Sequence, residues 1–200
     1  MDHYFTIEKP SLAEFKARGS RFIAYAFPIT DAAGFKKRLQ ELKKEHPKAV
    51  HHCFAYRIGT DGNEFRSSDD GEPAGTAGKP ILGQINSKSL VNMAVIVVRY
   101  FGGTLLGVPG LINAYKTVTA LALQVTPVVQ KQIEIPYALE FDYTLMNLVM
   151  IVIKQFNCTV IQQEMQLFCV VKAGIPRSRE AEVLYSLKEI QGVEINPIRL

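Results

Sequence analysis

The 200-residue sequence predicts an α+β protein of two domains, and three observations lead to this prediction. Residues 1–130 alternate apolar, strand-like runs with segments of helical periodicity. Residues 131–200 follow the order strand, helix, strand, strand, helix, strand, which is the βαββαβ plan of ferredoxin-like domains. Thr126-Pro127 and the polar stretch 130–132 separate the two patterns. We therefore expect one domain over residues 1–130 and a second over residues 131–200.

Start and stop residues define the individual elements. Thr30 or Asp31 suits the N-cap of a helix that ends before Pro47, and Pro80 suits the first turn of a short helix. The continuous apolar run 93–100 is typical of a buried strand. In the first domain we expect strands over 21–27, 51–57, 64–66 and 93–100, and helices over 31–45, 80–87 and from about residue 111. In the second we expect strands over 133–143, 158–164, 166–173 and 193–198, and helices over 144–156 and from about residue 178.

The composition is that of an ordinary globular protein, with 48% hydrophobic and 21% charged residues. No apolar run approaches the length of a transmembrane helix, and the N-terminus lacks the apolar core of a signal peptide. We therefore expect a cytoplasmic protein that has no membrane partner. Three cysteines without a C-x-x-C pair argue against a disulfide framework and a zinc ribbon.

Positive charge is concentrated in the first domain. Residues 1–130 carry 16 Lys and Arg against 11 Asp and Glu, a net charge of +5, whereas residues 131–200 carry 7 against 8, a net charge of −1. An acidic partner is therefore expected at the first domain, although a solvated surface explains so small an excess equally well. Four lysines share one face of the 31–45 helix, but two glutamates interleave with them, which favours a solvated surface there.

The segment 66–80 is the most informative part of the chain. It combines three acids, two serines, three glycines and one lysine without an apolar period, so it builds a loop rather than core. Gly71, Gly75 and Gly78 carry no Cβ and allow a ligand to approach the backbone. The loop leads into a helix, whose first free N–H groups form a natural anion site. An ordered turn with aspartate N-caps is the structural alternative, and the sequence leaves both open.

A second glycine-rich turn, 102–110, follows the strand that ends near Arg99. Its glycines lack the G-x-G-x-x-G spacing of a dinucleotide site, and Pro80 stands where a P-loop needs Ser or Thr. The turn is interpreted either as a second backbone wall for the same ligand or as close packing of helix on strand. His51 and Cys53 share one side of their strand, but no ligand spacing supports a metal site.

Three segments make the sequence similar to a known family. They are His51-His52-Cys53 with Ala55-Tyr56, then Ser68-Asp69-Asp70-Gly71-Glu72-Pro73-Ala74-Gly75-Thr76-Ala77-Gly78-Lys79-Pro80, then Val98-Arg99-Tyr100-Phe101-Gly102-Gly103 through Leu106-Gly107 and Gly110-Leu111. Together with Ser20-Arg21-Phe22-Ile23 they closely resemble the YigZ/IMPACT family, and the resemblance covers nearly the whole chain. The chain departs from the family pattern at Pro109 and Asn113, where glycine and a basic residue are usual.

The resemblance implies both a fold and a field of function. It implies an N-terminal domain with a ribosomal-protein-S5 domain-2-like fold and a C-terminal ferredoxin-like βαββαβ domain similar to the last domain of elongation factor G. Eukaryotic relatives of the family regulate translation by competing for an activator of an initiation-factor kinase. The bacterial members resemble proteins that associate with nucleic acid or with the ribosome.

Our leading hypothesis is a non-enzymatic cytoplasmic protein that binds RNA or the ribosome and modulates translation. The alternatives are an enzyme that acts on a small phosphorylated or peptide-like substrate through the loop Asp69–Lys79, and a protein–protein adaptor with a partner in translation control. The sequence predicts no catalytic residue, no metal and no cofactor. The candidate binding residues for an anion or nucleic acid, expected to converge on one concave surface, are His51, Ser68, Asp69, Asp70, Gly71, Glu72, Gly75, Gly78, Lys79, Arg99, Gly102 and Gly103.

Overall fold

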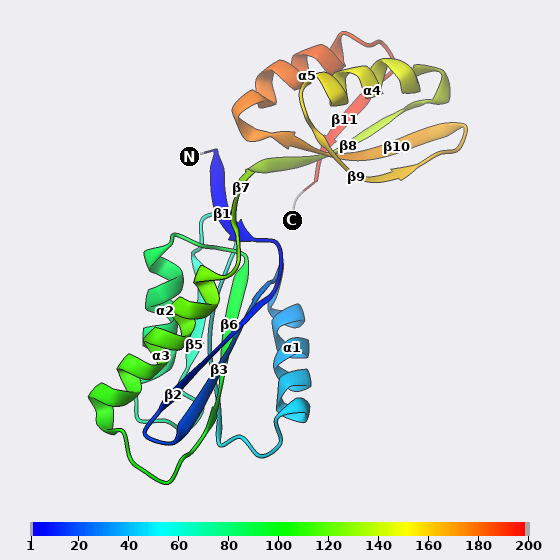
Figure 1. The fold of residues 1–200 in the computed structure, drawn as a ribbon. Helices are drawn as coiled ribbons and strands as arrows, with labels where there is room; N and C mark the ends of the chain where they lie inside the picture. Colours follow the sequence, from blue (N-terminus) through cyan, green and yellow to red (C-terminus); the bar gives the residue numbers. More distant parts are fainter. Residues whose placement is uncertain (1, 199–200) are drawn as a thin grey trace. The chain divides into compact units, whose positions relative to one another are not determined.

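The computed structural model describes residues 2–198 and divides the chain into two compact units. The N-terminal unit runs from Tyr4 to Lys131, and the C-terminal unit runs from Gln132 onward and includes residues 2 and 3. Each unit has its own apolar core. The α+β class predicted from the sequence is confirmed (Figure 1). Among the described residues, no helix is long and apolar enough to cross a membrane.

A five-stranded antiparallel sheet forms the centre of the N-terminal unit, in the strand order β2-β3-β6-β4-β5. Helices cover both faces of this sheet, which explains why its middle strand, β6, is almost wholly apolar (Figure 1). Helix α2 lies over β4 and β5, and α3 lies over β2 and β3, while α1 covers the opposite face. The elements are β2 (Ser11–Ala17), β3 (Ser20–Pro28), α1 (Ala32–Glu45), β4 (His51–Ile58), β5 (Glu64–Ser68), α2 (Gly78–Ser87), β6 (Met93–Tyr100) and α3 (Gly107–Gln124).

Strand register decides which side chains share the α2–α3 face of the sheet. Arg99, near the end of β6, pairs with Phe22 of β3 on one side and with His51 of β4 on the other. Because side chains alternate along a strand, Cys53 points to the same face as His51. Phe22, Cys53 and Tyr115 of α3 all belong to the core beneath α2 and α3. The His51–Arg99 pair therefore lies at one end of that core.

Sequence patterns missed three strands. They are β2 and the two strands of a separate ladder, β1 (His3–Ile7) and β7 (Val128–Gln132), all but one residue of each lying in the N-terminal unit. Strand β2 did carry a signal, since Ala13, Phe15 and Ala17 alternate with polar residues and pack against the core. Strand β7 is exposed along almost its whole length, so it has no apolar pattern to detect.

The C-terminal unit has the ferredoxin-like topology that the sequence predicts. Its four antiparallel strands lie in the order β11-β8-β10-β9, so the first and third strands of the unit are central. Val149, Val183 and Leu187 of its two helices pack on one face of the sheet. The elements are β8 (Glu134–Asp142), η1 (Tyr143–Leu145), α4 (Met146–Gln155), β9 (Thr159–Glu164), β10 (Phe168–Pro176), η2 (Arg177–Arg179), α5 (Glu180–Lys188) and β11 (Glu194–Pro197).

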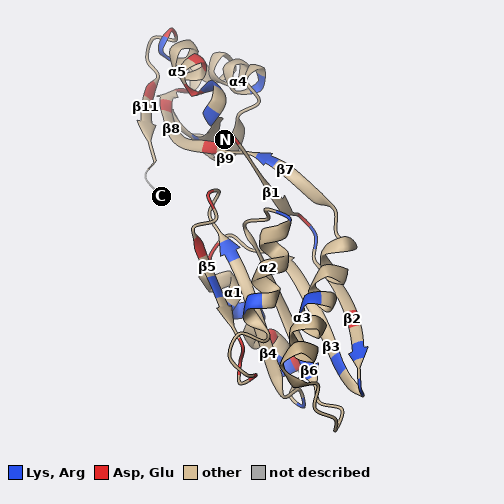
Figure 2. Cartoon of the chain, turned by 90° about the vertical axis from the view of Figure 1, so that its left-hand side faces the viewer, with Lys and Arg blue, Asp and Glu red and all other residues tan. Residues whose placement is uncertain are grey.

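Basic residues are distributed over several elements of the N-terminal unit. Figure 2 shows Lys and Arg on β2, β3 and α3. Helix α1 adds four exposed lysines, at positions 36, 37, 43 and 44. The positive charge of this unit is therefore spread over its surface rather than confined to the loop 66–80.

Candidate functional site

A cavity of about 390 Å³ opens where β4 begins and β6 ends, and we call it the Glu72 cavity. Its polar lining consists of His51, Glu72 and Arg99, and all other lining residues are apolar or glycine. This combination of apolar walls and few polar groups is typical of sites for small ligands. The walls come mainly from the segment between β6 and α3 and from the start of α3, and are formed by Val50, Pro73, Phe101, Leu105, Leu106, Gly107, Val108 and Leu111.

Glu72 and Arg99 form a buried ion pair at the base of the cavity. Nη1 of Arg99 donates to Oε1 of Glu72 at 2.6 Å, and the two side chains are only 6% and 3% exposed. The hydroxyl of Tyr115 donates to the same oxygen at 2.7 Å. Nη2 of Arg99 donates to Oγ of Ser20 at 3.3 Å, while Nε has no partner among residues 2–198. The charge of Arg99 is thus neutralised by a carboxylate of the protein itself, so a phosphate would gain little from it.

His51 presents its second ring nitrogen to the same place. Its Nδ1 lies 2.8 Å from the carbonyl oxygen of Asp70. A carbonyl oxygen only accepts, so Nδ1 carries a hydrogen, and the lone pair of the neutral ring is on Nε2. This Nε2 lies 3.8 Å from Oε2 of Glu72. Two atoms that accept a hydrogen bond or a proton therefore lie side by side in the cavity.

Cys53 lies beneath this floor and is not a nucleophile in the present arrangement. Its thiol donates to the carbonyl oxygen of Asp69 at 2.9 Å and to the hydroxyl oxygen of Tyr115 at 3.3 Å. Burial raises the pKa of the Cys53 thiol far above its usual value, and burial likewise raises the pKa of Tyr115. Both groups therefore stay protonated at neutral pH, and Tyr115 remains a donor to Glu72.

Asp69 occupies the N-terminal end of α2. Its Oδ1 accepts from the backbone N–H groups of Ala77 at 3.0 Å and Gly78 at 2.8 Å, and its Oδ2 accepts from Gly75 at 2.8 Å. Burial by itself raises the pKa of the Asp69 carboxyl, but these three hydrogen bonds and the nearby charge of Lys79 outweigh it and hold the pKa below its usual value. The anion at this helix end is thus a side chain of the loop itself.

Three further predicted residues lie around the Glu72 cavity rather than in it. Asp70 accepts the backbone N–H of His52 at 2.6 Å and lies 3.7 Å from Nζ of Lys43, on the α1 side of the sheet. Oγ of Ser68 accepts the backbone N–H of Asp70 at 3.2 Å. Lys79 is exposed in the first turn of α2. His51, Glu72 and Arg99 are accordingly the predicted side chains that the structure brings together.

The predicted glycines serve the backbone, and two of them permit close packing. A Cβ on Gly78 would lie 2.7 Å from the backbone nitrogen of Ser68, and one on Gly102 would overlap the backbone of Gly19. The N–H of Gly102 also donates to Oγ of Ser20 at 3.2 Å. Close packing is therefore the role of Gly102, while residues 105–108 of the same turn form the cavity wall. The left-handed backbone conformation is adopted by Gly71, Gly75 and Gly103.

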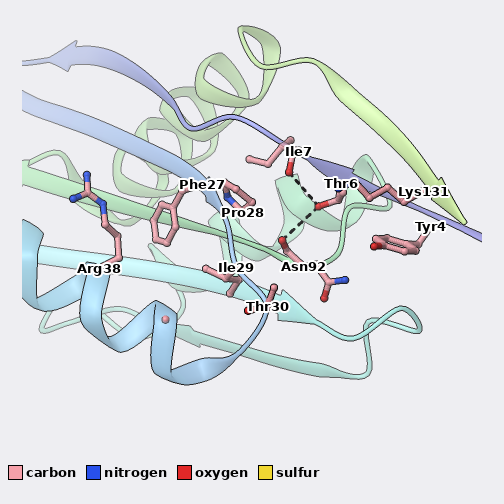
Figure 3. Close-up of a pocket in the computed structure, with 11 residues that line it drawn as sticks. Tyr4, Thr6, Ile7, Phe27, Pro28, Ile29, Thr30, Arg38, Asn92 and Lys131 are labelled. Carbon is pink, nitrogen blue, oxygen red and sulfur yellow. Dashed lines mark hydrogen bonds between the residues drawn. The ribbon is translucent and has the colours of Figure 1, made fainter. Parts of the chain in front are cut away.

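A second cavity, of about 490 Å³, lies at the opposite end of the sheet, where β3 ends (Figure 3). Figure 3 shows Phe27 between Arg38 on one side and Lys131 on the other. Arg38 and Lys131 each pair with a glutamate, at 3.1 Å in both cases. The hydroxyl of Thr6 donates to the backbone oxygen of Asn92 at 3.4 Å. These polar groups already have partners in the chain, so we place the candidate site at the Glu72 cavity.

Comparisons with known proteins match both units. The model of the Impact N-terminal domain matches residues 18–123. The IMPACT family member YigZ of Escherichia coli is 34% identical over 82% of this chain and 81% of its own length. The Protein IMPACT homolog of Saccharomyces cerevisiae is 38% identical over 45% of this chain and 36% of its own. A crystal structure described as that of a hypothetical protein is 30% identical and covers 100% of this chain and 98% of its own, with a TM-score of 0.77.

Proposed function

We propose a role in the control of translation for this chain, which belongs to the IMPACT family. In this proposal the protein works in the cytoplasm and binds RNA or the ribosome through its N-terminal unit. The proposal rests mainly on family membership, because the resemblance to this family implies a role in translation, which its eukaryotic members regulate. The matched residues, 18–123, make up most of the N-terminal unit, so we assign the shared function to that unit.

The exposed basic face of α1 supports binding of a polyanion. Lys36 and Lys37 recur two helical turns later as Lys43 and Lys44, so the four lysines follow one side of the helix. Lys43 lies 3.7 Å from Oδ1 of Asp70, which brings this face next to the loop 66–80. Basic residues on β2, β3 and α3 spread the charge further (Figure 2). A few dispersed phosphate contacts give weak binding, and these contacts by themselves do not distinguish one RNA sequence from another.

Salt dependence tests this proposal. Each lysine that neutralises a phosphate releases a counterion, so affinity for single-stranded RNA falls as the salt concentration rises. Replacing Lys37 and Lys44 by glutamine should reduce the slope of log affinity against log salt by about 1.4, at about 0.7 per contact. Fluorescence anisotropy of a labelled RNA measures the slope, and co-sedimentation measures binding to ribosomes.

The matched control for this test removes two exposed lysines from the helices of the C-terminal unit, as Lys154→Gln with Lys188→Gln. The change in net charge is the same, and the slope should not change. An equal decrease in both double variants would contradict the assignment to the N-terminal unit. Protein that binds neither RNA nor ribosomes at low salt would refute the proposed function.

An enzyme is the second candidate function, and the paired acceptor atoms of His51 and Glu72 favour it. A ring nitrogen and a carboxylate oxygen 3.8 Å apart in an apolar cavity could remove a proton from a bound substrate. The two functions respond differently to His51→Asn. This variant should leave the slope of log RNA affinity against log salt unchanged, because that slope counts phosphate contacts, whereas an enzyme of this kind would lose its turnover. Loss of a measurable hydrolytic or transfer activity, in a protein that does not bind RNA, would establish the enzyme.

A further inference from the structure

We propose that the Glu72 cavity binds a nucleobase that carries an exocyclic amino group. The inference rests on the proposed function in that it names the part of RNA that the N-terminal unit would recognise. The cavity, its acceptor atoms and its apolar walls carry the inference, and the lysines of α1 have no part in it. It is therefore tested separately from RNA binding as such.

Two acceptor atoms in the cavity receive no hydrogen bond from the described part of the chain, residues 2–198. Oε1 of Glu72 receives two hydrogen bonds, from Arg99 and Tyr115, but Oε2 receives none from residues 2–198. Nδ1 of His51 donates to the Asp70 carbonyl, which selects the tautomer whose lone pair is on Nε2. The 3.8 Å between Nε2 and Oε2 is too long for a hydrogen bond. A ligand amino group has two divergent hydrogens and can donate one to each atom.

Charge selects a neutral donor. An anion would face two acceptor atoms, and the ion pair with Glu72 already neutralises Arg99, so an anion gains little here. An ammonium group would approach the buried guanidinium of Arg99, which lies 2.6 Å from the same carboxylate. Aliphatic amines are cationic at neutral pH. Neutral –NH2 donors are therefore carboxamides and the amino groups of aromatic rings.

The apolar walls of the cavity favour an amino group that is attached to an aromatic ring. Phe101, which is 46% exposed, and the side chains of Leu105 and Val108 line the entrance with apolar surface. The centroid of the Phe101 ring lies 5.6 Å from Cζ of Arg99, so the ring stands next to the Glu72–Arg99 pair. An unpaired base can stack on such a ring while its edge reaches the acceptors. A carboxamide side chain has no comparable face to bury, and a volume of about 390 Å³ accommodates a base.

Pairs of nucleosides in which only one member carries the exocyclic amino group test the proposal directly; the group is replaced by hydrogen in the two purine pairs and by a carbonyl oxygen in uridine. We would titrate the full-length protein with guanosine against inosine, adenosine against purine riboside, and cytidine against uridine, and follow binding by NMR. The amino member of each pair should bind about tenfold more tightly, with a dissociation constant of about 0.1–1 mM. Equal affinities within all three pairs would overturn the proposal.

Two variants with one control connect the preference to the cavity. His51→Asn keeps a donor for the Asp70 carbonyl but lacks Nε2, so the preference for the amino member should fall to about threefold or less. Phe101→Ala alters an exposed side chain and should weaken both members about tenfold by removing the stacking surface. Phe65→Ala removes an exposed aromatic ring from β5 and should change neither affinity. If His51→Asn does not fold, the nucleoside affinities of Phe101→Ala and Phe65→Ala still test the proposal. Equal nucleoside affinities in these two variants would overturn it.

Competition with RNA distinguishes the two sources of such a base. If the base belongs to RNA, a single-stranded oligonucleotide rich in adenine and cytosine displaces the nucleoside and an oligouridine does not. If neither oligonucleotide displaces it, the cavity serves a free nucleoside or nucleotide. Nucleoside binding without binding of RNA or ribosomes refutes the proposed function alone, whereas RNA binding without nucleoside binding refutes this inference alone.

Discussion

Replacement of Asp69, in the loop 66–80, should cost a substantial part of the protein's stability. Its carboxylate accepts from three backbone N–H groups, and two of these belong to buried residues, Ala77 and Gly78. A buried donor that loses its acceptor costs about 1–3 kcal/mol, while Gly75 is partly exposed and can turn to water. We therefore expect Asp69→Ala to lower the free energy of unfolding by about 2–6 kcal/mol. Asp69→Asn keeps one carbonyl oxygen and should cost about half as much.

Urea unfolding followed by circular dichroism measures this difference. Asp61→Ala is the matched control, because Asp61 also accepts a backbone N–H, that of Asn63 at 3.1 Å, but in an exposed turn. The control should lower the free energy of unfolding by only about 0.5 kcal/mol. If the free energy of unfolding of Asp69→Ala differs from that of the unchanged protein by less than about 0.5 kcal/mol, the Asp69 carboxylate does not stabilise the start of α2 as argued.

The pH dependence of stability gives an independent check on Asp69. Its pKa is lowered in the folded protein, so the carboxylate stabilises the fold at pH values above the unfolded pKa of about 3.9. This contribution is lost as the pH falls through the folded pKa, because the unfolded chain then binds the proton more readily. The unchanged protein should lose stability below about pH 5, and Asp69→Asn should lose less over the same interval. If the free energy of unfolding falls with pH by the same amount in the unchanged protein and in Asp69→Asn, the pKa of Asp69 is not lowered in the folded state.

Three further predictions concern packing, domain structure and thiol reactivity. Gly102→Ala should lower the free energy of unfolding by about 2 kcal/mol or more, because the new Cβ would overlap backbone atoms. Gly83→Ala, which has open space around it in α2, should raise the free energy of unfolding by about 0.5–1 kcal/mol. Equal free energies of unfolding in the two variants would contradict this prediction. A fragment that ends at Gln132 keeps β7 and both N-terminal cores and should unfold cooperatively, whereas a fragment that ends at Thr126 lacks β7 and should not. If the fragment that ends at Gln132 is molten, the division into two units is wrong. Burial raises the pKa of Cys158 to about 11, so its alkylation at pH 8 should be slow, and rapid modification in native protein would contradict this burial.

Local signals in the sequence located most of the elements. Asp31 caps α1 with its side chain, accepting the N–H of Gly34 at 2.7 Å, and the helix ends before Pro47 as its stop signals predict. The apolar run of β6 predicted a strand buried on both faces. Helix α2 begins at Gly78, two residues before Pro80, because the Asp69 carboxylate caps its first N–H groups. That cap comes from nine residues upstream, beyond the reach of a local rule.

The candidate site was only partly predictable. The sequence predicted His51, Glu72 and Arg99 as binding residues, but it predicted Lys79 as well. Lys79 is exposed in the structure, whereas Arg99 is buried against the carboxylate of Glu72. Tyr115 lies among apolar residues of α3, and the helix pattern gives no sign that its hydroxyl reaches Glu72 across 43 positions of the chain. Such pairings depend on tertiary packing, and no periodicity in one sequence encodes them.

The acids of the loop 66–80 would be expected to repel an anionic partner, but the structure shows that each is engaged within the protein. Asp69 neutralises the N-terminal end of α2, Glu72 pairs with Arg99, and Asp70 binds the backbone of β4 and lies beside Lys43. Their charges therefore organise the loop instead of projecting from it, and the basic residues of α1 remain beside it. A density of acids in this loop is thus compatible with binding RNA, and the two acceptor atoms left in the cavity favour an uncharged base over a phosphate.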